Sequence, residues 1–200
     1  MKLNKNIWIR KSIHLFVAFL PILYYHFLSR YQFFIIILIL TLIALLIELL
    51  RFKNKNFASL FYKVFGKLLW KQESHTFTGS TTFLIGALIS TALFTKPVTV
   101  TVLLFLTFGD TIAYFVGKSP HISFMRGRKI KVFGEKTLEG AIACFLMSII
   151  IVLIIPEIKL WHGILGALLA SIVELLPWGI DDNFSIPVIS GALLQLLAHI

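Results

Sequence analysis

The sequence of 200 residues is strongly apolar and basic. Hydrophobic residues make up 58% of it and charged residues only 14%, and the formal net charge is +10. The mean hydropathy is +0.91. The apolar share lies above and the charged share below those of ordinary soluble domains. These values exclude a soluble globular domain and indicate an integral membrane protein.

Seven stretches of the chain are apolar and close to the length of about 17 to 25 residues that crosses a bilayer core. The first follows basic residues, as a signal peptide does, but YYHFLSRYQ after it has no small-residue cleavage site, so we retain it as a span. The sequence therefore predicts one all-α domain, residues 1–200, a polytopic bundle of about seven transmembrane helices. The predicted spans are 12–28, 33–50, 77–95, 98–116, 138–155, 160–176 and 186–200.

The basic residues predict the orientation of these spans. Of the 19 Lys and Arg residues, 16 precede the first span or lie in the connections 51–76 and 117–137. The opposite side has only Arg30, Lys96 and Lys159. Because cytoplasmic loops retain basic residues, the N-terminus is predicted to be cytoplasmic and the C-terminus external. Topology and contact with anionic lipids then explain the positive charge, and no nucleic-acid partner is expected.

The connection 51–76, RFKNKNFASLFYKVFGKLLWKQESHT, differs from the spans because it alternates basic residues with Phe, Leu and Trp70 at roughly helical spacing. Such a pattern is typical of an amphipathic helix that lies on the membrane surface. We therefore expect a structural helix on the cytoplasmic leaflet.

Asp110 lies in the fourth predicted span, within LTFGDTIAYFVGK and about two helical turns, roughly 10 Å, from its inner end. A carboxylate inside the membrane costs about 2.5–3.5 kcal/mol on insertion scales, so it needs a partner or a wet cavity. Glu48 and Glu174 also lie near inner span ends, where the helix dipole favours cations, whereas the four inner span N-termini favour anions. Anion sites beside cation sites suit a phosphate chain with Mg²⁺, which binds one or two carboxylates plus phosphate oxygens.

The segment GRKIKVFGEKTLEG, residues 127–140, leads into the fifth span. Gly134 gives backbone freedom, Lys136 is a candidate phosphate partner, Thr137 a candidate N-cap, and Glu139 lies on the same helix face as Lys136. The simpler interpretation is a basic loop followed by a capped helix. The segment is not a P-loop, because the glycine spacing and the preceding strand are absent.

The connection LLPWGIDDNFSIPVISG, residues 175–191, has Asp181, Asp182 and Asn183 between the last two spans. One of these, or Ser185, could cap the last helix, with Pro187 in its first turn. A cap needs one such residue, not three. Two adjacent carboxylates in a cytoplasmic connection without Lys or Arg therefore indicate a metal site.

Other polar groups lie at the inner ends of the first three spans. Ser80 and Thr81, in SHTFTGSTTFLIG, could bind a lipid headgroup, but helix capping and bonds to the helix backbone explain them equally well. His14 could equally be a packed histidine. The candidate headgroup residues are His14, Glu48, Arg51, Ser80 and Thr81.

Together the motifs GDTIAYFVGK, GEKTLEG, DDNFSIP, RKSIH and ELLR resemble the polyprenol kinase family, that is, the dolichol, phytol and CTP-dependent diacylglycerol kinases. The resemblance covers about residues 10 to 190. It implies transfer of a phosphoryl group from a nucleoside triphosphate, CTP in preference to ATP, to the hydroxyl of a membrane lipid alcohol. The related phosphatidate cytidylyltransferases share GDTxAYxxG and GKTxEG, but their C-terminal signature with His-Gly-Gly is absent here, which favours a kinase.

The resulting hypothesis is a cytoplasm-facing active site at the cell's inner membrane. Mg²⁺ would bind Asp110, Asp181, Asp182 and Asn183, while Lys136, Thr137 and Lys118 would bind the phosphates. Asp110 or Glu139 would receive the acceptor's proton. The alternatives are a CTP-dependent cytidylyltransferase that makes a CDP-lipid and an ion-coupled transporter. The sequence leaves open whether the alcohol is a polyprenol, phytol-like or diacylglycerol, and whether the protein is a homodimer.

Overall fold

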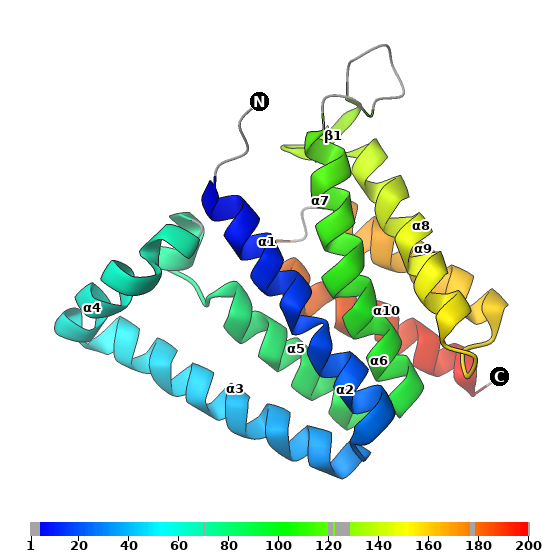
Figure 1. Ribbon diagram of the computed structural model, residues 1–200, viewed down its shortest axis with the longest axis horizontal. Coiled ribbons are helices and arrows are strands. Elements are labelled where there is room, and N and C mark those ends of the chain that lie inside the picture. Colours follow the sequence, from blue (N-terminus) through cyan, green and yellow to red (C-terminus); the bar gives the residue numbers. More distant parts are fainter. Residues whose placement is uncertain (1–4, 70, 120–121, 123–128, 177–178, 200) are drawn as a thin grey trace.

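The computed structural model describes residues 5–69, 71–119, 122, 129–176 and 179–199. It is a helical bundle with one small antiparallel hairpin (Figure 1). In chain order the elements are α1 (Lys5–Val17), α2 (Phe19–Phe27), α3 (Arg30–Lys53), α4 (Lys55–Phe65), the 3₁₀ turns η1 (Gly66–Leu68) and η2 (Lys71–Ser74), α5 (Gly79–Leu93), α6 (Lys96–Leu104), the π-helical segment η3 (Phe105–Asp110), α7 (Thr111–Lys118), β1 (Lys131–Phe133), β2 (Lys136–Thr137), α8 (Leu138–Ile154), α9 (Leu160–Leu175) and α10 (Asp182–Ala198).

Each of the seven predicted spans coincides with helical structure. By length and composition, two continuous helical stretches, Arg30–Lys53 and Lys96–Lys118, suffice to cross a membrane. The helices α5, α8, α9 and α10 are apolar but shorter. The predicted helical bundle is thus confirmed for the described part of the chain, except that residues 131–137, which were expected to be a loop, form the β1–β2 hairpin. The number of spans and their orientation stay predictions.

The first predicted span is divided into α1 and α2 at Ala18. Pro21 has no backbone N–H, so it cannot donate to the carbonyl of Val17, four residues earlier. The N–H of Ala18 bonds instead to the carbonyl oxygen of Leu15 at 3.1 Å, and α2 begins at Phe19. The hydrogen-bond pattern therefore changes between α1 and α2, although Ala18 itself keeps right-handed helical angles, with φ of −59° and ψ of −20°.

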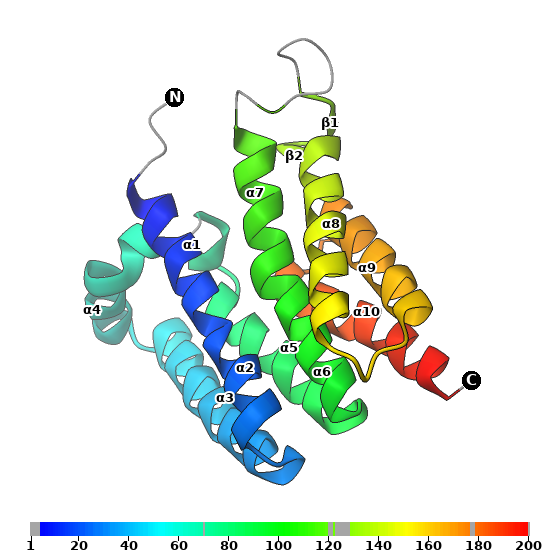
Figure 2. The same cartoon turned by 45° about the vertical axis from the view of Figure 1, so that its right-hand side comes forward.

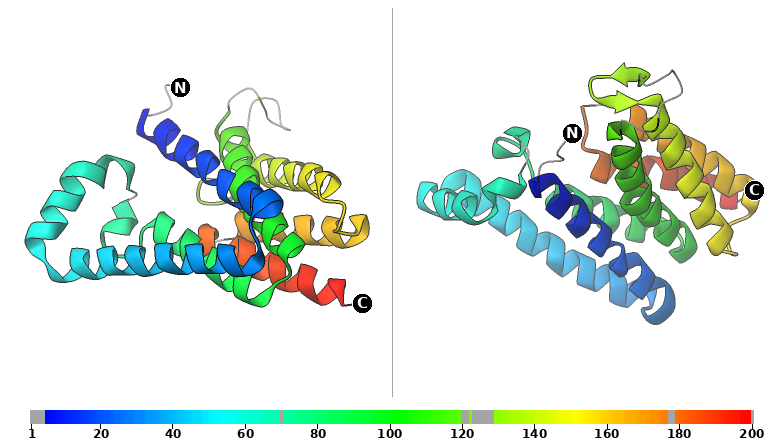
Figure 3. Two further views of the ribbon diagram at one scale, coloured as in Figure 1. Left: turned by 60° about the horizontal axis from the view of Figure 1, so that its bottom comes forward. Right: turned by 45° about the horizontal axis from the view of Figure 1, so that its top comes forward.

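The connection 51–76 is not one helix. Arg51 still belongs to α3, which ends at Lys53, and Asn54 caps α4 by accepting hydrogen bonds from the N–H groups of Asn56 and Phe57. The amphipathic helix is limited to α4, which turns away from the bundle at the end of α3 (Figure 3). Its location on the membrane surface stays a prediction.

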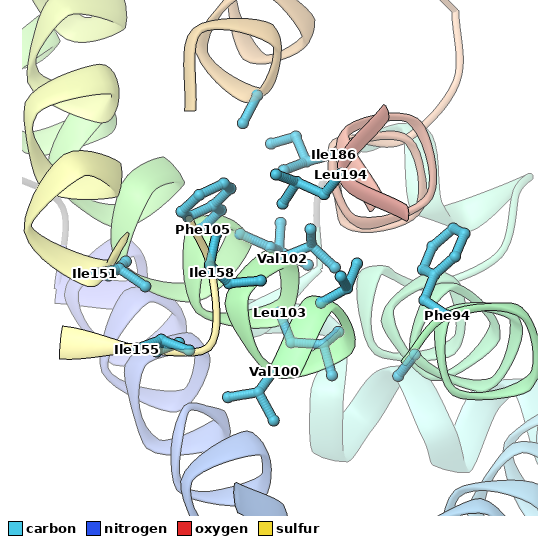
Figure 4. Close-up of a cluster of buried hydrophobic side chains, with 14 of the residues drawn as sticks. Phe94, Val100, Val102, Leu103, Phe105, Ile151, Ile155, Ile158, Ile186 and Leu194 are labelled. Atoms are coloured by element: carbon cyan, nitrogen blue, oxygen red, sulfur yellow. The ribbon is translucent and has the colours of Figure 1, made fainter. Parts of the chain in front are cut away.

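The core is centred on α6, where the side chains of Val98, Val100, Val102 and Leu103 are buried. Figure 4 shows Val102, Leu103 and Phe105 between side chains of α8 and α10. Glycines let the helices approach closely: a Cβ atom at Gly166 would lie 2.7 Å from Leu194, and one at Gly163 2.2 Å from Val152. Small residues at such contacts are typical of helices that pack in membranes.

The connections predicted to be cytoplasmic lie toward one side of the molecule. The N-terminal end of α1, the helix α4 and the β1–β2 hairpin lie toward the top and left of Figures 1 and 2. The α2–α3 and α5–α6 connections and the C-terminal end of α10 lie toward the opposite side. The polar motifs of the first side are thereby brought near one another.

Candidate active site

Asp110 ends the π-helical segment η3 and forms an ion pair with the first helix. The Nζ atom of Lys11 lies 2.6 Å from Oδ2 of Asp110. The Nε2 atom of His14 lies 3.5 Å from the same oxygen and 3.4 Å from the carbonyl oxygen of Leu106. The carboxylate that the sequence predicted to need a partner therefore has one from α1. Lys11 was not among the predicted site residues.

The π-helical turn lies directly before α7, and such turns occur frequently at functional sites. Gly109 allows this wider turn to approach α8, because a Cβ atom there would lie 2.9 Å from the Sγ atom of Cys144. The sequence analysis did not predict the π turn, because Phe105–Asp110 lies inside the fourth predicted span.

Lys136 connects the hairpin to the ends of α9 and α10. Its Nζ atom lies 2.8 Å from Oδ2 of Asp182 and also donates to the backbone carbonyl oxygen of Glu174. Gly134, with a φ of 55°, makes the turn that returns the chain from β1 to β2. The hairpin thus holds Lys136 over the start of α10.

The two ion pairs are electrostatic neighbours. The charge of Lys136 acts on Asp110, and Asp110 acts on both Asp182 and Glu174. η3 packs against both α9 and α10, which explains this proximity. The structure therefore brings together Asp110, Lys136 and Asp182, and adds Lys11 and the buried Glu174 to them.

Asp181 and Asn183 have a different arrangement. Asp181 caps α10, because its Oδ1 atom accepts hydrogen bonds from the backbone N–H of Asn183 at 2.8 Å and from the side-chain Nδ2 at 2.7 Å. The capping alternative thus applies to Asp181, while Asp182 reaches Lys136. The two adjacent carboxylates have separate partners.

Among the residues that the structure describes, no group of three or more His, Cys, Asp and Glu side chains is arranged to hold a metal ion. Of the four predicted ligands, Asp110 and Asp182 are within electrostatic range of each other, and each already has a lysine partner. Two hard carboxylate oxygens fit Mg²⁺ that takes its other ligands from phosphate and water. They do not form a complete protein cage, and the metal role stays a prediction.

Glu139, Thr137 and Lys118 lie around the hairpin. Glu139 is buried, and its two carboxylate oxygens each lie 3.3 Å from the backbone nitrogen of Ile130. The Thr137 hydroxyl accepts from the N–H of Gly140 at 3.2 Å, which confirms the predicted N-cap of α8. Lys118 pairs at the surface with Glu135, and this contact lowers the pKa of the Glu135 carboxyl.

A second cluster joins α1, α5 and α10. The guanidinium of Arg10 contacts both carboxylate oxygens of Glu73, at 2.7 and 2.8 Å, and the N–H of Gly79 donates to Oε1 of Glu73 at 2.7 Å. A Cβ atom at Gly79 would lie 2.9 Å from Nη2 of Arg10 and 3.0 Å from Nδ2 of Asn183. Arg10 neighbours Lys11 and Asn183 neighbours Asp182, so this cluster adjoins the first one.

The five candidate headgroup residues do not form one site. Glu48 and Arg51 are a buried ion pair: Glu48 accepts from the backbone N–H of Thr78 at 2.8 Å and from the hydroxyl of Thr81 at 3.1 Å. His14 contacts Asp110 instead, and Ser80 is exposed. The Glu48–Arg51 pair therefore anchors the connection before α5, and a headgroup role for these residues stays a prediction.

Comparisons with known proteins agree with the predicted class of enzyme. No protein-family model matches the chain, and no solved structure matches it significantly. The CTP-dependent diacylglycerol kinase 1 of Saccharomyces cerevisiae is 29% identical over 180 residues, which cover 77% of this chain and 60% of the relative. Its counterpart in Eremothecium gossypii is 27% identical over 186 residues, which cover 77% and 55%.

A third relative, from Schizosaccharomyces pombe, is 26% identical over 170 residues, which cover 75% of this chain and 74% of the relative. The chain thus spans little more than half the length of the first two relatives. All three carry the diacylglycerol kinase name. The comparison supports a likeness to CTP-dependent lipid kinases, and not to polyprenol kinases in particular.

Proposed function

We propose that this protein is a membrane-bound lipid kinase that transfers a phosphoryl group from CTP to the hydroxyl of diacylglycerol. The observation that carries the proposal is the pair of neighbouring ion pairs, Lys11–Asp110 and Lys136–Asp182, contributed by α1, η3, β2 and α10. Two cations beside two carboxylates suit a phosphate chain and its divalent cation. The names of the three relatives support the choice of nucleotide and lipid.

The proposed roles follow from charge. Asp110 and Asp182 would hold Mg²⁺, which when bound neutralises phosphate charge during transfer. The Lys136 side chain would turn from Asp182 to a phosphate oxygen. The Lys11 side chain would neutralise negative phosphate charge beside Asp110. Phosphoryl transfer depends mainly on such positioning and on charge stabilisation, so these side chains require no covalent step.

A carboxylate must also orient the acceptor hydroxyl and receive its proton. The sequence left this role to Asp110 or Glu139. The Glu139 carboxylate faces the amide of Ile130, whereas Asp110 lies beside Lys11 and within electrostatic range of Lys136. Asp110 and Glu139 both stay candidates for this role.

The proposed location is the inner membrane of the cell, with the active site on the cytoplasmic side. CTP is cytosolic and diacylglycerol resides in the bilayer, so a site at the inner interface can receive both. The positions of the basic residues support this orientation, because 16 of the 19 Lys and Arg residues fall in segments that the predicted topology puts on the cytoplasmic side.

The test is product analysis with the purified protein in lipid nanodiscs. CTP and ATP are each supplied with Mg²⁺ and with diacylglycerol, a polyprenol or phytol, and the lipid products are identified by mass spectrometry. We expect phosphatidic acid and CDP from the pair CTP and diacylglycerol. A CDP-lipid with released pyrophosphate would instead indicate a cytidylyltransferase, and no phosphorylated lipid from any pair would refute the kinase.

A further inference from the structure

We infer that Glu73 is a positioning residue that holds α1 in the place where Lys11 reaches Asp110. The expected effect of Glu73 on the reaction rate rests on the proposed function. Its expected effect on the position of α1 does not. Glu73 lies in η2, in the connection between α4 and α5, and the sequence analysis assigned it no role. Its carboxylate is almost fully buried although it belongs to a connecting segment.

The contacts of Glu73 join two helices. Its two oxygens accept from Nη1 and Nη2 of Arg10 on α1, and Oε1 also accepts from the N–H of Gly79, the first residue of α5. A bidentate arginine–carboxylate pair fixes both distance and orientation. Since Arg10 is followed directly by Lys11, fixing the Arg10 backbone also fixes the start of the Lys11 side chain.

Among the residues that the structure describes, this end of α1 makes other contacts as well. Its outer face is exposed at Trp8, Ile9, Ile13 and Phe16, where the exposed fraction reaches 77%. Trp8 packs on Phe115 of α7. Within the described part of the chain, α1 also makes polar contacts with Asp110, Leu106 and Leu68.

The side chain of Glu73 is separable from the anchor of its own segment. Arg51 donates to the backbone carbonyl oxygens of Glu73 and Thr76, at 2.5 and 2.6 Å, and Glu48 accepts from the N–H of Thr78. None of these bonds uses the Glu73 carboxylate. Removing that carboxylate should therefore release α1 while the connection stays attached to α3.

The first test measures the position of α1 without any reference to activity. Spin labels are attached to cysteines introduced at Ile9, which is 40% exposed, and at Leu146 on α8, which is 57% exposed, in a Cys144→Ala background. Pulsed electron paramagnetic resonance should show a narrow distribution of distances between the two labels when Glu73 is present, and a broader distribution in the Glu73→Ala variant. Glu157→Gln is the matched control, because it removes a carboxylate that contacts Tyr25 at the far end of the bundle. An unchanged distribution in Glu73→Ala would overturn the inference.

The second test measures lipid phosphate formation per folded molecule. Misplacement by about 1 Å costs on the order of 100-fold in rate, so we expect a loss of this size in kcat for Glu73→Ala. Glu73→Gln should lose less, because its amide oxygen still accepts from Gly79 or Arg10. A purely structural role would lower the yield or melting temperature and leave kcat per folded molecule at the wild-type value. A wild type without kinase activity would refute the proposed function, while the distance measurement would still decide the role of Glu73.

Discussion

Asp110 shows how a single charge is accommodated inside an apolar helix. The sequence predicted that this carboxylate needs a partner, because an unpaired charge in the membrane is costly. It could not identify Lys11, which lies 99 positions earlier in the chain, because contacts between distant segments follow from helix packing. The spacing of three between Lys11 and His14 is the signal that was available, since it puts both on one helix face.

The first prediction concerns Asp110→Asn. This change keeps the size of the side chain but removes the charge opposite Lys11, so turnover should be abolished while the protein remains inserted. The measurement is phosphatidic acid formation from CTP, with size-exclusion chromatography to confirm the folded state. Near-normal activity in this variant would remove Asp110 from the mechanism.

The second prediction concerns Lys136→Met, which removes the charge and retains most of the side-chain length. The loss of one charge-stabilising group typically costs about 100- to 1,000-fold in kcat, and we expect an effect of this order. Lys63→Met on α4 is the matched control, because Lys63 is exposed and outside the candidate site. Equal activity of the two variants would contradict the role of Lys136.

At the scale of the elements, apolar length was a good guide to where helices lie but a poor guide to how they are shaped. The cap at Thr137 followed from its position before an apolar run, and the structure confirms it. The break at Ala18 was foreseeable from Pro21, whereas the π turn before Asp110 had no local signal. The division of 51–76 was missed because Asn54, a good N-cap, was read as part of one helix.

The third prediction concerns the contact between α7 and α8. A Cβ atom at Gly140 would lie 2.8 Å from the backbone carbonyl oxygen of Ala113, which cannot move alone. Gly140→Ala should therefore destabilise the protein by about 1–3 kcal/mol, the usual cost of overpacking. Gly66→Ala is the control, because its nearest neighbour, Cβ of Tyr62, is 3.7 Å away. Thermal unfolding in detergent should show a lower melting temperature for Gly140→Ala alone.

At the scale of the whole molecule, the sequence could suggest which distant motifs lie near one another but could not establish it. The sequence grouped Asp110, Lys136 and Asp182 because their spans end on the same side, and the structure brings them into electrostatic range. It did not predict the Glu73 cluster, because Glu73 is the single acidic residue of a basic connection and forms no motif with its sequence neighbours.

The fourth prediction tests the orientation. Cys144, the single cysteine of the chain, is buried and should not react, so introduced cysteines report their own position. Lys159→Cys, in the connection before α9, should react with a membrane-impermeant maleimide on intact cells. Lys55→Cys on α4 should react only after the membrane is opened. Both residues are exposed in the structure, and the reverse pattern would invert the proposed topology.

The helices of this bundle differ greatly in length. α3 has 24 residues, or about 36 Å, whereas α5, α8, α9 and α10 have 15 to 17 residues, or about 23 to 26 Å. For the predicted spans, a hydrocarbon layer about 30 Å thick matches neither set, so we expect α3 to tilt and the lipids beside the shorter helices to compress. In a bilayer of longer acyl chains this mismatch would grow at the short helices, and we expect the lipid headgroups there to be drawn inward, toward the proposed active site.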